Sequence, residues 1–177
     1  MVATTMQNSS ANQLTRVVES LLPPDHRVAT GSSFYWSPQT KTIHVDADRL
    51  STPHGQLALL HEASHALLGH ASYSSDVSLL KLEVAAWDKA RELAALLGVE
   101  ADSDHIEDCL DTYRDWLYAR SSCPNCHISG LQSTKDAYEC VNCAKSWRVS
   151  GSRFCRVYRM EHRHKKTPPQ PTETVFS

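Results

Sequence analysis

The sequence predicts an α+β fold in two parts, a compact domain followed by a small module that a metal ion holds together. Three observations lead to this expectation. Short β-branched and aromatic runs lie between residues 33 and 46, three segments with helical apolar periodicity follow between residues 53 and 120, and two CxxC pairs come after them. With 177 residues, of which 41% are hydrophobic, the chain has room for one ordinary domain and one minimal module.

The first part of the domain is predicted to contain one helix and a β-hairpin. Residues 14–22 space their apolar side chains as a short helix does, and a Pro-Pro pair ends it. The polar residues before it, 1–12, are expected to be flexible. The runs at 33–36 and 41–46 flank a Ser-Pro-Gln-Thr turn and therefore predict two antiparallel strands.

Three further helices are predicted after the hairpin. Thr52 followed by Pro53 is typical of a helix start, so we expect the first of them to begin there. The second covers residues 76–97 and ends at a glycine. The third begins with Asp104 and Glu107, which have capping-box spacing, and continues to about residue 120.

The net charge of −2 conceals an uneven distribution of charged residues. Residues 1–143 carry 10 Lys or Arg against 18 Asp or Glu, whereas residues 144–166 carry 8 Lys or Arg against one Glu. Three aromatic residues interrupt the basic run: Trp147, Phe154 and Tyr158. Because arginines bind phosphates and aromatic rings stack on bases, nucleic acid is one expected partner of residues 145–166. A solvated basic end fits the composition equally well.

Nothing in the sequence predicts secretion or membrane insertion. The N-terminus is polar, and no stretch reaches the ~20 consecutive apolar residues that span a bilayer. Six cysteines without a signal peptide favour metal ligation or free thiols over disulfides. We therefore expect a cytoplasmic protein that has no membrane partner.

Residues 61–70, HEASHALLGH, place metal-binding side chains on a helix. His61 and His65 lie within about 40° of each other on its apolar side, so both can bind one metal ion. Glu62 beside them can take a proton from water, which is the HExxH arrangement. The alternative is a pair of core-facing histidines satisfied by hydrogen bonds. His70 would point about 180° away if the helix continued, so we exclude it as a ligand.

Glu83 is the predicted third ligand. A hydrolytic zinc site uses three protein ligands and leaves one position for water. Glu83 lies about 40° from the centre of the apolar stripe on its helix, whereas Asp88 and Glu92 are on the opposite, solvated side. A buried carboxylate is unfavourable unless something compensates its charge. We therefore expect either a metal ion or a paired Arg or Tyr beside Glu83.

Cys123 and Cys126 form one CxxC pair, Cys140 and Cys143 form a second, and thirteen residues separate the two pairs. Two such pairs joined by a hairpin-length insert predict a Cys₄ zinc ribbon. Four thiolates leave no open coordination position, so this zinc is expected to be structural and necessary for folding. Disulfides are the weaker alternative. Cys109, on the apolar side of its helix, is predicted to be a free thiol.

HEASHALLGH followed by LEVAAWDKARELA resembles the gluzincins and, more narrowly, the ImmA/IrrE family of small cytoplasmic metallopeptidases. The FYWSPQTKTIHVDAD hairpin also fits, so the resemblance covers about residues 30–100. It implies a compact zincin-like domain whose edge strand binds the substrate backbone. It also implies that His61, His65 and Glu83 bind a catalytic zinc. Glu62 would then be the general base of a peptidase that cleaves a specific intracellular protein.

Two other functions stay open. SprT-like DNA-associated proteases resemble the chain in size and in having a zinc ribbon after HExxH, but their third ligand is usually a histidine in a GHG-like segment, which is absent here. A non-catalytic adaptor that binds nucleic acid, with a purely structural HExxH zinc, is the other alternative. If the chain is hydrolytic, Tyr73, His105 and Tyr113 are the candidates for stabilising the oxyanion.

These expectations assign two Zn²⁺ ions, one catalytic and one structural, and divide the chain into four parts. The parts are a flexible N-terminus over residues 1–12, a zincin-like metallopeptidase domain over 13–120, a zinc ribbon with a basic strand over 121–160, and a disordered basic, proline-rich tail over 161–177.

Overall fold

The computed structural model describes residues 2–151 and 159–161 and has an α+β architecture. The chain forms two compact units, one ending at Tyr118 and the other beginning at Ala119. The sequence placed this boundary after residue 120. None of the helices in the described ranges is long and apolar enough to cross a membrane.

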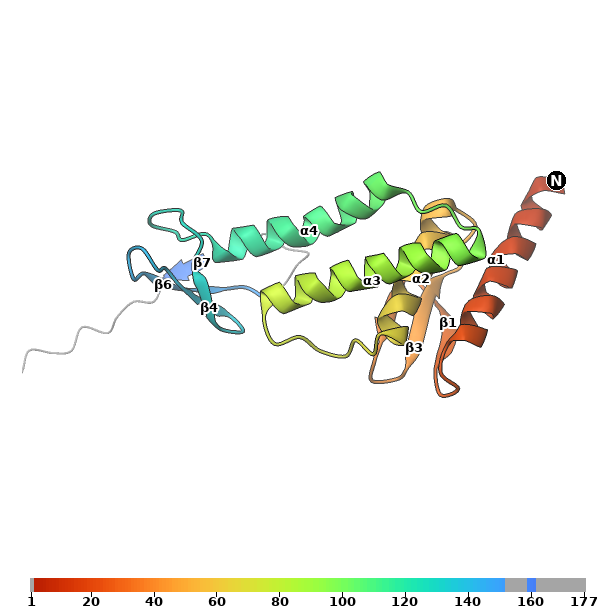
Figure 1. The fold of residues 1–177 in the computed structure, drawn as a ribbon, viewed down its shortest axis with the longest axis horizontal. Coiled ribbons are helices and arrows are strands. Elements are labelled where there is room, and N and C mark those ends of the chain that lie inside the picture. The colour runs from red at the N-terminus through yellow and green to blue at the C-terminus, as the bar shows by residue number, and fades with distance from the viewer. Residues whose placement is uncertain (1, 152–158, 162–177) are drawn as a thin grey trace, which may run out of the picture. The chain divides into compact units, whose positions relative to one another are not determined.

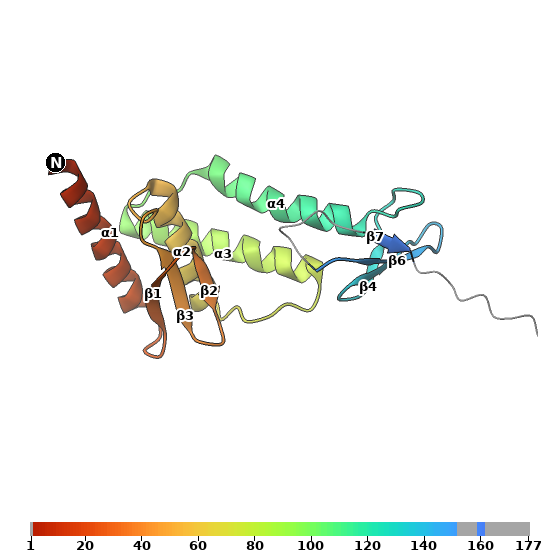
Figure 2. The same cartoon turned by 180° about the vertical axis from the view of Figure 1, so that it is seen from behind.

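The sheet of the first unit contains the predicted hairpin and one strand more. β2 (Tyr35–Ser37) pairs antiparallel with β3 (Thr42–Asp46), which confirms the hairpin. β1 (Arg27–Gly31) pairs parallel with β3, so the strand order is β1-β3-β2 (Figure 2). β2 is thus an edge strand. β1 was not predicted because its sequence, RVATG, is short and only weakly alternating.

The first helix, α1 (Val2–Leu21), is longer than the sequence predicted. The sequence predicted a helix only over residues 14–22, whereas the structure has residues 2–13 in the same helix; the flexibility expected of residues 1–12 stays a prediction. No glycine or proline interrupts residues 2–21, so their polar composition does not prevent a helix. Leu14 and Val18 are buried and attach α1 to the rest of the unit.

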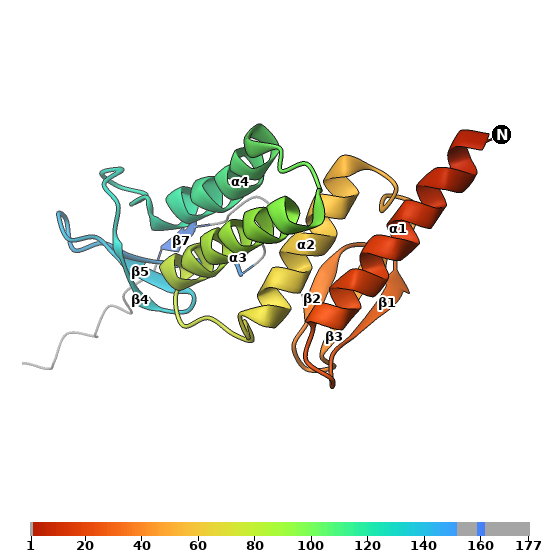
Figure 3. The same ribbon diagram turned by 45° about the vertical axis from the view of Figure 1, so that its right-hand side comes forward.

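Three more helices follow, and α2 lies between the sheet and α3 (Figure 3). They are α2 (Pro53–Leu67), α3 (Asp76–Leu97) and α4 (Ser103–Ser121), and Figure 1 shows their order along the chain. Thr52 caps α2 by accepting a hydrogen bond from the Gly55 amide at 3.0 Å, as its sequence predicted. α3 ends at Gly98 in the left-handed conformation, again as predicted.

The cap of α4 differs from the predicted one. The side chain of Asp102 accepts hydrogen bonds from the amides of Asp104 and His105 at 3.0 and 3.1 Å. The capping residue is therefore Asp102, and the proposed pairing of Asp104 with Glu107 is wrong. Two acidic residues two positions apart offer alternative caps, and sequence spacing alone does not choose between them.

Gly55, in the first turn of α2, has no room for a side chain. A Cβ atom there would lie 1.9 Å from the carbonyl oxygen of Arg49. The loop after β3, residues 47–51, therefore packs directly against the start of α2. This contact sets the position of Arg49 relative to the helix that carries the HExxH residues.

The second unit is a four-stranded antiparallel sheet in the order β4-β5-β6-β7. Its strands are β4 (Leu131–Thr134), β5 (Ala137–Glu139), β6 (Ser146–Val149) and β7 (Arg159–Glu161). Tyr138 and Trp147 stack with ring centroids 5.7 Å apart and are buried. The Trp147 indole donates to the Arg120 carbonyl at 2.9 Å. The predicted tail lies outside the described residues from 162 onward.

Candidate functional site

α2 brings two histidines together on its buried side. His61 and His65 are one helical turn apart, and their Nε2 atoms are 3.1 Å from each other. The rings meet edge to face, with centroids 4.6 Å apart. Trp87 stacks on the His61 ring at 4.0 Å, so the imidazole is held in place from the α3 side.

α3 adds a carboxylate to this pair. Oε2 of Glu83 lies 3.3 Å from Nε2 of His61 and 3.5 Å from Nε2 of His65. Glu83 is only 6% exposed, whereas Asp88 and Glu92 on the same helix face solvent as predicted. The three side chains form one of the two groups in the described part of the chain that could hold a metal ion.

The spacing of these three atoms fits tetrahedral zinc. Two ligand atoms that each lie ~2.0–2.1 Å from a tetrahedral zinc are about 3.3 Å apart. The measured separations are 3.1, 3.3 and 3.5 Å. Oε2 of Glu83 is buried and makes no hydrogen bond of regular geometry, and a cation shared with the two nearby imidazoles would compensate its burial.

The charge state of Glu83 suits a metal ligand. Burial acts to raise its pKa, but the contacts with His61 and His65 outweigh this and lower the pKa below the ordinary value. Glu83 is therefore a carboxylate anion at neutral pH, which is the form that binds a metal ion. Within the described residues Glu83 forms ion pairs with two histidines, whereas the alternative to a metal ion had expected an Arg or a Tyr beside it.

Glu62 lies next to this group and is held by the edge strand. Its Oε2 accepts a hydrogen bond from the backbone amide of Trp36 at 2.7 Å. The Trp36 indole donates in turn to the carbonyl oxygen of His70 at 2.8 Å. One residue of β2 thus fixes both the HExxH glutamate and the segment after α2. Sequence spacing gave no indication of this role for Trp36.

His70 is closer to the site than its sequence position implied. α2 ends at Leu67 and Gly69 adopts φ +67°, so the chain turns back and does not continue the helix. Nδ1 of His70 lies 2.9 Å from Nδ1 of His65, the ring nitrogen that faces away from Glu83. His70 is not part of the metal-binding group, but the predicted direction of its side chain was wrong.

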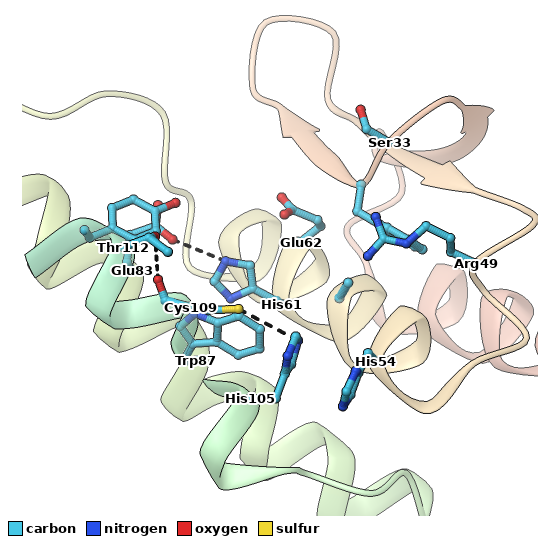
Figure 4. A pocket seen from close by; sticks show the side chains of 13 residues that line it. Ser33, Arg49, His54, His61, Glu62, Glu83, Trp87, His105, Cys109 and Thr112 are labelled. Carbon is cyan, nitrogen blue, oxygen red and sulfur yellow. Dashed lines mark hydrogen bonds and ion pairs between the residues drawn. The ribbon is translucent and has the colours of Figure 1, made fainter. Parts of the chain in front are cut away.

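A pocket of about 330 Å³ adjoins the three-residue group (Figure 4). Arg49 and Glu62 lie on the side nearer the sheet, and Glu83 and Trp87 on the side of α3. Of the oxyanion candidates, His105 and Tyr113 line the pocket. Tyr73 is outside the pocket lining and is 37% exposed.

α4 closes the other side of the pocket with a neutral histidine and a protonated thiol. His105 stacks on His54 with centroids 4.0 Å apart, and burial lowers its pKa. Nε2 of His54 lies 3.1 Å from Asp102. Sγ of Cys109 is 3.8 Å from the His105 ring, and burial raises the pKa of this thiol. Cys109 is therefore a weak nucleophile and a weak metal ligand at neutral pH.

The four cysteines of the second unit form the other metal-binding group. The Sγ atoms lie 3.7 Å apart for Cys123 and Cys143, 3.4 Å for Cys126 and Cys140, and 3.7 Å for Cys126 and Cys143. Sulfur ligands ~2.3 Å from a tetrahedral zinc are about 3.8 Å apart, so these positions fit. All four are free thiols, and a hydrogen bond from the Ile128 backbone lowers the pKa of Cys126 to about 6.

The predicted nucleic-acid segment is only partly described. Phe154 and Tyr158 lie outside the described residues, as do 152–158 and 162–166 as a whole. Within the described part, the Arg148 guanidinium pairs with Asp136 and is therefore partly neutralised. Binding of nucleic acid by residues 145–166 stays a prediction.

Comparison of the chain with models of protein families, with curated proteins and with solved structures finds no match. The function is therefore inferred from the residues and their geometry.

Proposed function

We propose that the chain is a zinc-dependent peptidase that hydrolyses peptide bonds of a specific intracellular protein. In this proposal a zincin-like domain over residues 13–120 carries the active site, and a Cys₄ zinc ribbon over 121–160 accompanies it. The observation that carries the proposal is the buried group of His61, His65 and Glu83 beside Glu62 at the wall of a pocket.

His61, His65 and Glu83 would hold the catalytic zinc. When bound, the ion would polarise the scissile carbonyl and acidify a water molecule. Glu62 would act as the general base, accepting a proton from the attacking water molecule and passing it to the leaving amine. The amide of Trp36 holds one oxygen of Glu62, which leaves the other oxygen available for the proton. His105 and Tyr113, which line the pocket, are the candidates to donate a hydrogen bond to the oxyanion.

A catalytic role explains this group better than a structural one. Three protein ligands leave a fourth zinc position for water, whereas structural sites usually have four protein ligands. His61, Glu62 and Glu83 all border a pocket, so the fourth position can be reached from solvent. The four cysteines of the second group supply a complete ligand set, which supports a structural zinc there.

The alternatives make different predictions about the same residues. In an SprT-like DNA-associated protease a histidine would complete the catalytic zinc site, and here Glu83 occupies that place. In a non-catalytic adaptor the HExxH zinc would be structural, and Glu62 would have no chemical task. The proposal therefore depends most directly on what Glu62 does.

The deciding experiment compares wild-type protein with Glu62→Gln. Both are purified with zinc, their zinc content is measured, and each is incubated with a proteome-derived peptide library whose new termini are identified by mass spectrometry. We expect equal zinc content and loss of at least about 100-fold in turnover for Glu62→Gln, since general-base catalysis typically contributes 10²–10⁴. Glu92→Gln, on the solvated side of α3, is the matched control and should keep full activity. Equal turnover of Glu62→Gln and wild type would refute the assignment.

The physiological substrate requires a cellular version of this comparison. Cells that contain wild-type protein should accumulate cleaved forms of one or a few proteins that are absent from Glu62→Gln cells. A cytoplasmic location is part of the proposal, and the cleaved proteins should come from that compartment.

A further inference from the structure

Arg49 lines the pocket and has no acidic partner in the described part of the chain. It belongs to the loop between β3 and α2, and its side chain is exposed. The guanidinium lies over the ring of Phe34, 5.7 Å from the centroid, and Phe34 lines the same pocket. This cation–π contact orients the charge without neutralising it.

The carboxylates around Arg49 are already engaged. Glu62 accepts from the Trp36 amide, and Glu83 is paired with two histidines. Asp102 accepts from two backbone amides and contacts His54. Asp46, which precedes the Arg49 loop, accepts from backbone amides of that loop. Arg49 therefore forms no ion pair with these carboxylates, and its guanidinium is available to a carboxylate from outside the chain.

The other basic groups of the pocket do not compete with Arg49 for an anion. Burial lowers the pKa of His105, and the charges of His54 and Arg49 act in the same direction. His54 is already in contact with Asp102. Arg49 is thus the residue through which the pocket can bind a carboxylate with two parallel hydrogen bonds.

We propose that Arg49 forms a subsite for a carboxylate of the peptide substrate, an Asp or Glu side chain close to the scissile bond. This inference rests on the proposed peptidase function and adds a substrate class to it. Arg49 and Glu62 lie on the same side of the pocket, so a bound acidic side chain would be near the reacting bond (Figure 4). The pocket volume of about 330 Å³ is within the range of ~300–1,000 Å³ typical of ligand sites.

The test measures binding separately from turnover. Zinc-loaded full-length Glu62→Gln protein is used to select peptides from a pooled octapeptide library. In each peptide one position is Glu or Gln and the other seven positions are neutral. Half of the peptides have a free C-terminus and half an amide. We expect Glu to be enriched about 10- to 100-fold over Gln at one position, as for a charge-assisted hydrogen bond.

The variants of Arg49 are made in the same background. Arg49→Gln should reduce the enrichment to about one, and Arg49→Lys should keep part of it because the charge remains while the planar fork is lost. Arg16→Gln, an exposed arginine on α1, is the control and should bind as the parent does. All variants should keep the parent's zinc content and melting temperature, since Arg49 is exposed and the cation–π contact with Phe34 is weak.

Each outcome is decisive. Absence of Glu enrichment, or enrichment that survives Arg49→Gln, overturns the subsite. Enrichment of the free C-terminus alone overturns the side-chain assignment and identifies the chain end as the carboxylate bound. Acid preference that depends on Arg49, in a protein whose wild-type form cleaves nothing, retains the subsite and rejects the peptidase. Cleavage without a preference for acidic peptides retains the peptidase and rejects the subsite.

Discussion

The two candidate metal sites differ in what supports them. The cysteines come from two short turns, and within the described residues the buried hydrophobic cluster around them adds Tyr138, Trp147 and Val149. The His61, His65 and Glu83 group stands on two long helices whose common core contains 17 buried hydrophobic residues. The cysteine site would therefore need its metal ion in order to form. The packing of the helices would hold His61, His65 and Glu83 together without a metal ion.

This contrast separates the consequences of losing each ion. A module with so small a core would depend on a bound zinc ion for its stability. The helices of the first unit should keep their apolar packing without a metal ion. The expected loss there is therefore of zinc binding and of hydrolysis, and not of the fold. Variants that remove one ion at a time test the distinction.

The largest effect is expected for Cys123→Ser combined with Cys126→Ser. Zinc content should fall from two ions to one, and residues 119–151 should lose their protection from hydrogen exchange. Structural zinc contributes about 10–16 kcal/mol in small zinc modules, far more than this core can replace. Residues 13–118 should stay protected. If the variant kept both ions, or if α2 and α3 also lost their protection from hydrogen exchange, the proposed difference between the two sites would be wrong.

Glu83→Ala should empty the other site without unfolding its unit. Zinc affinity there should fall by more than the 10- to 100-fold typical of losing an outer-shell partner, and hydrolysis should stop. The metal-free unit should stay folded with a lowered melting temperature, because the contacts of Glu83 with His61 and His65 are lost while the apolar core is unchanged. Glu92→Ala serves as the exposed control on the same helix. A Glu83→Ala protein that still binds two ions would end the assignment of this ligand.

Chelation should release the two ions in sequence. A zinc ion held by His61, His65 and Glu83 beside the pocket would have one coordination position open, whereas four thiolates would enclose theirs. Titration with a chelator should therefore remove activity and one zinc before any loss of structure, followed by unfolding of the second unit. Zinc content and near-ultraviolet circular dichroism monitor the two steps. Release of both ions at the same chelator concentration would contradict the prediction.

The smallest effect is expected for His70→Ala. Because His70 contacts the outer ring nitrogen of His65, it helps to orient that ligand without binding the metal. Affinity for the catalytic zinc should fall about 10-fold, with two ions still bound at saturation. His70→Asn, which retains a polar group there, should recover part of the affinity. His44→Ala, in β3, is the control; an equal loss in that variant would indicate a general effect on folding.

Local spacing predicted the parts of the two sites that depend on one element. His61 and His65 follow from the helical repeat, Glu83 from a carboxylate on an apolar stripe, and the cysteines from their paired spacing. The structure brings His61, His65 and Glu83 together in one group and the four cysteines together in another. The proposed activity follows from resemblance and chemistry, and no match to a known protein supports it.

The residues that the sequence missed act across elements. Trp36 reaches Glu62 and His70 from an edge strand, and Arg49 reaches the pocket from a loop. The position of His70 depends on where α2 ends, and only the left-handed turn at Gly69 reveals it. Such contacts depend on how the elements pack against each other, and periodicity along one element contains no information about them.

Gly55 limits how this protein can vary in evolution. Any side chain there would collide with the backbone of Arg49, whereas Gly69 and Gly98 have open space around them and need only a left-handed conformation that asparagine also adopts. Descendant sequences should therefore keep glycine at position 55 while positions 69 and 98 exchange with asparagine. An inherited change at Gly55 would displace the Arg49 loop while His61 and His65 keep their places on α2. If Arg49 selects the substrate as proposed, such a change would alter substrate selection and leave the metal-binding side chains in place.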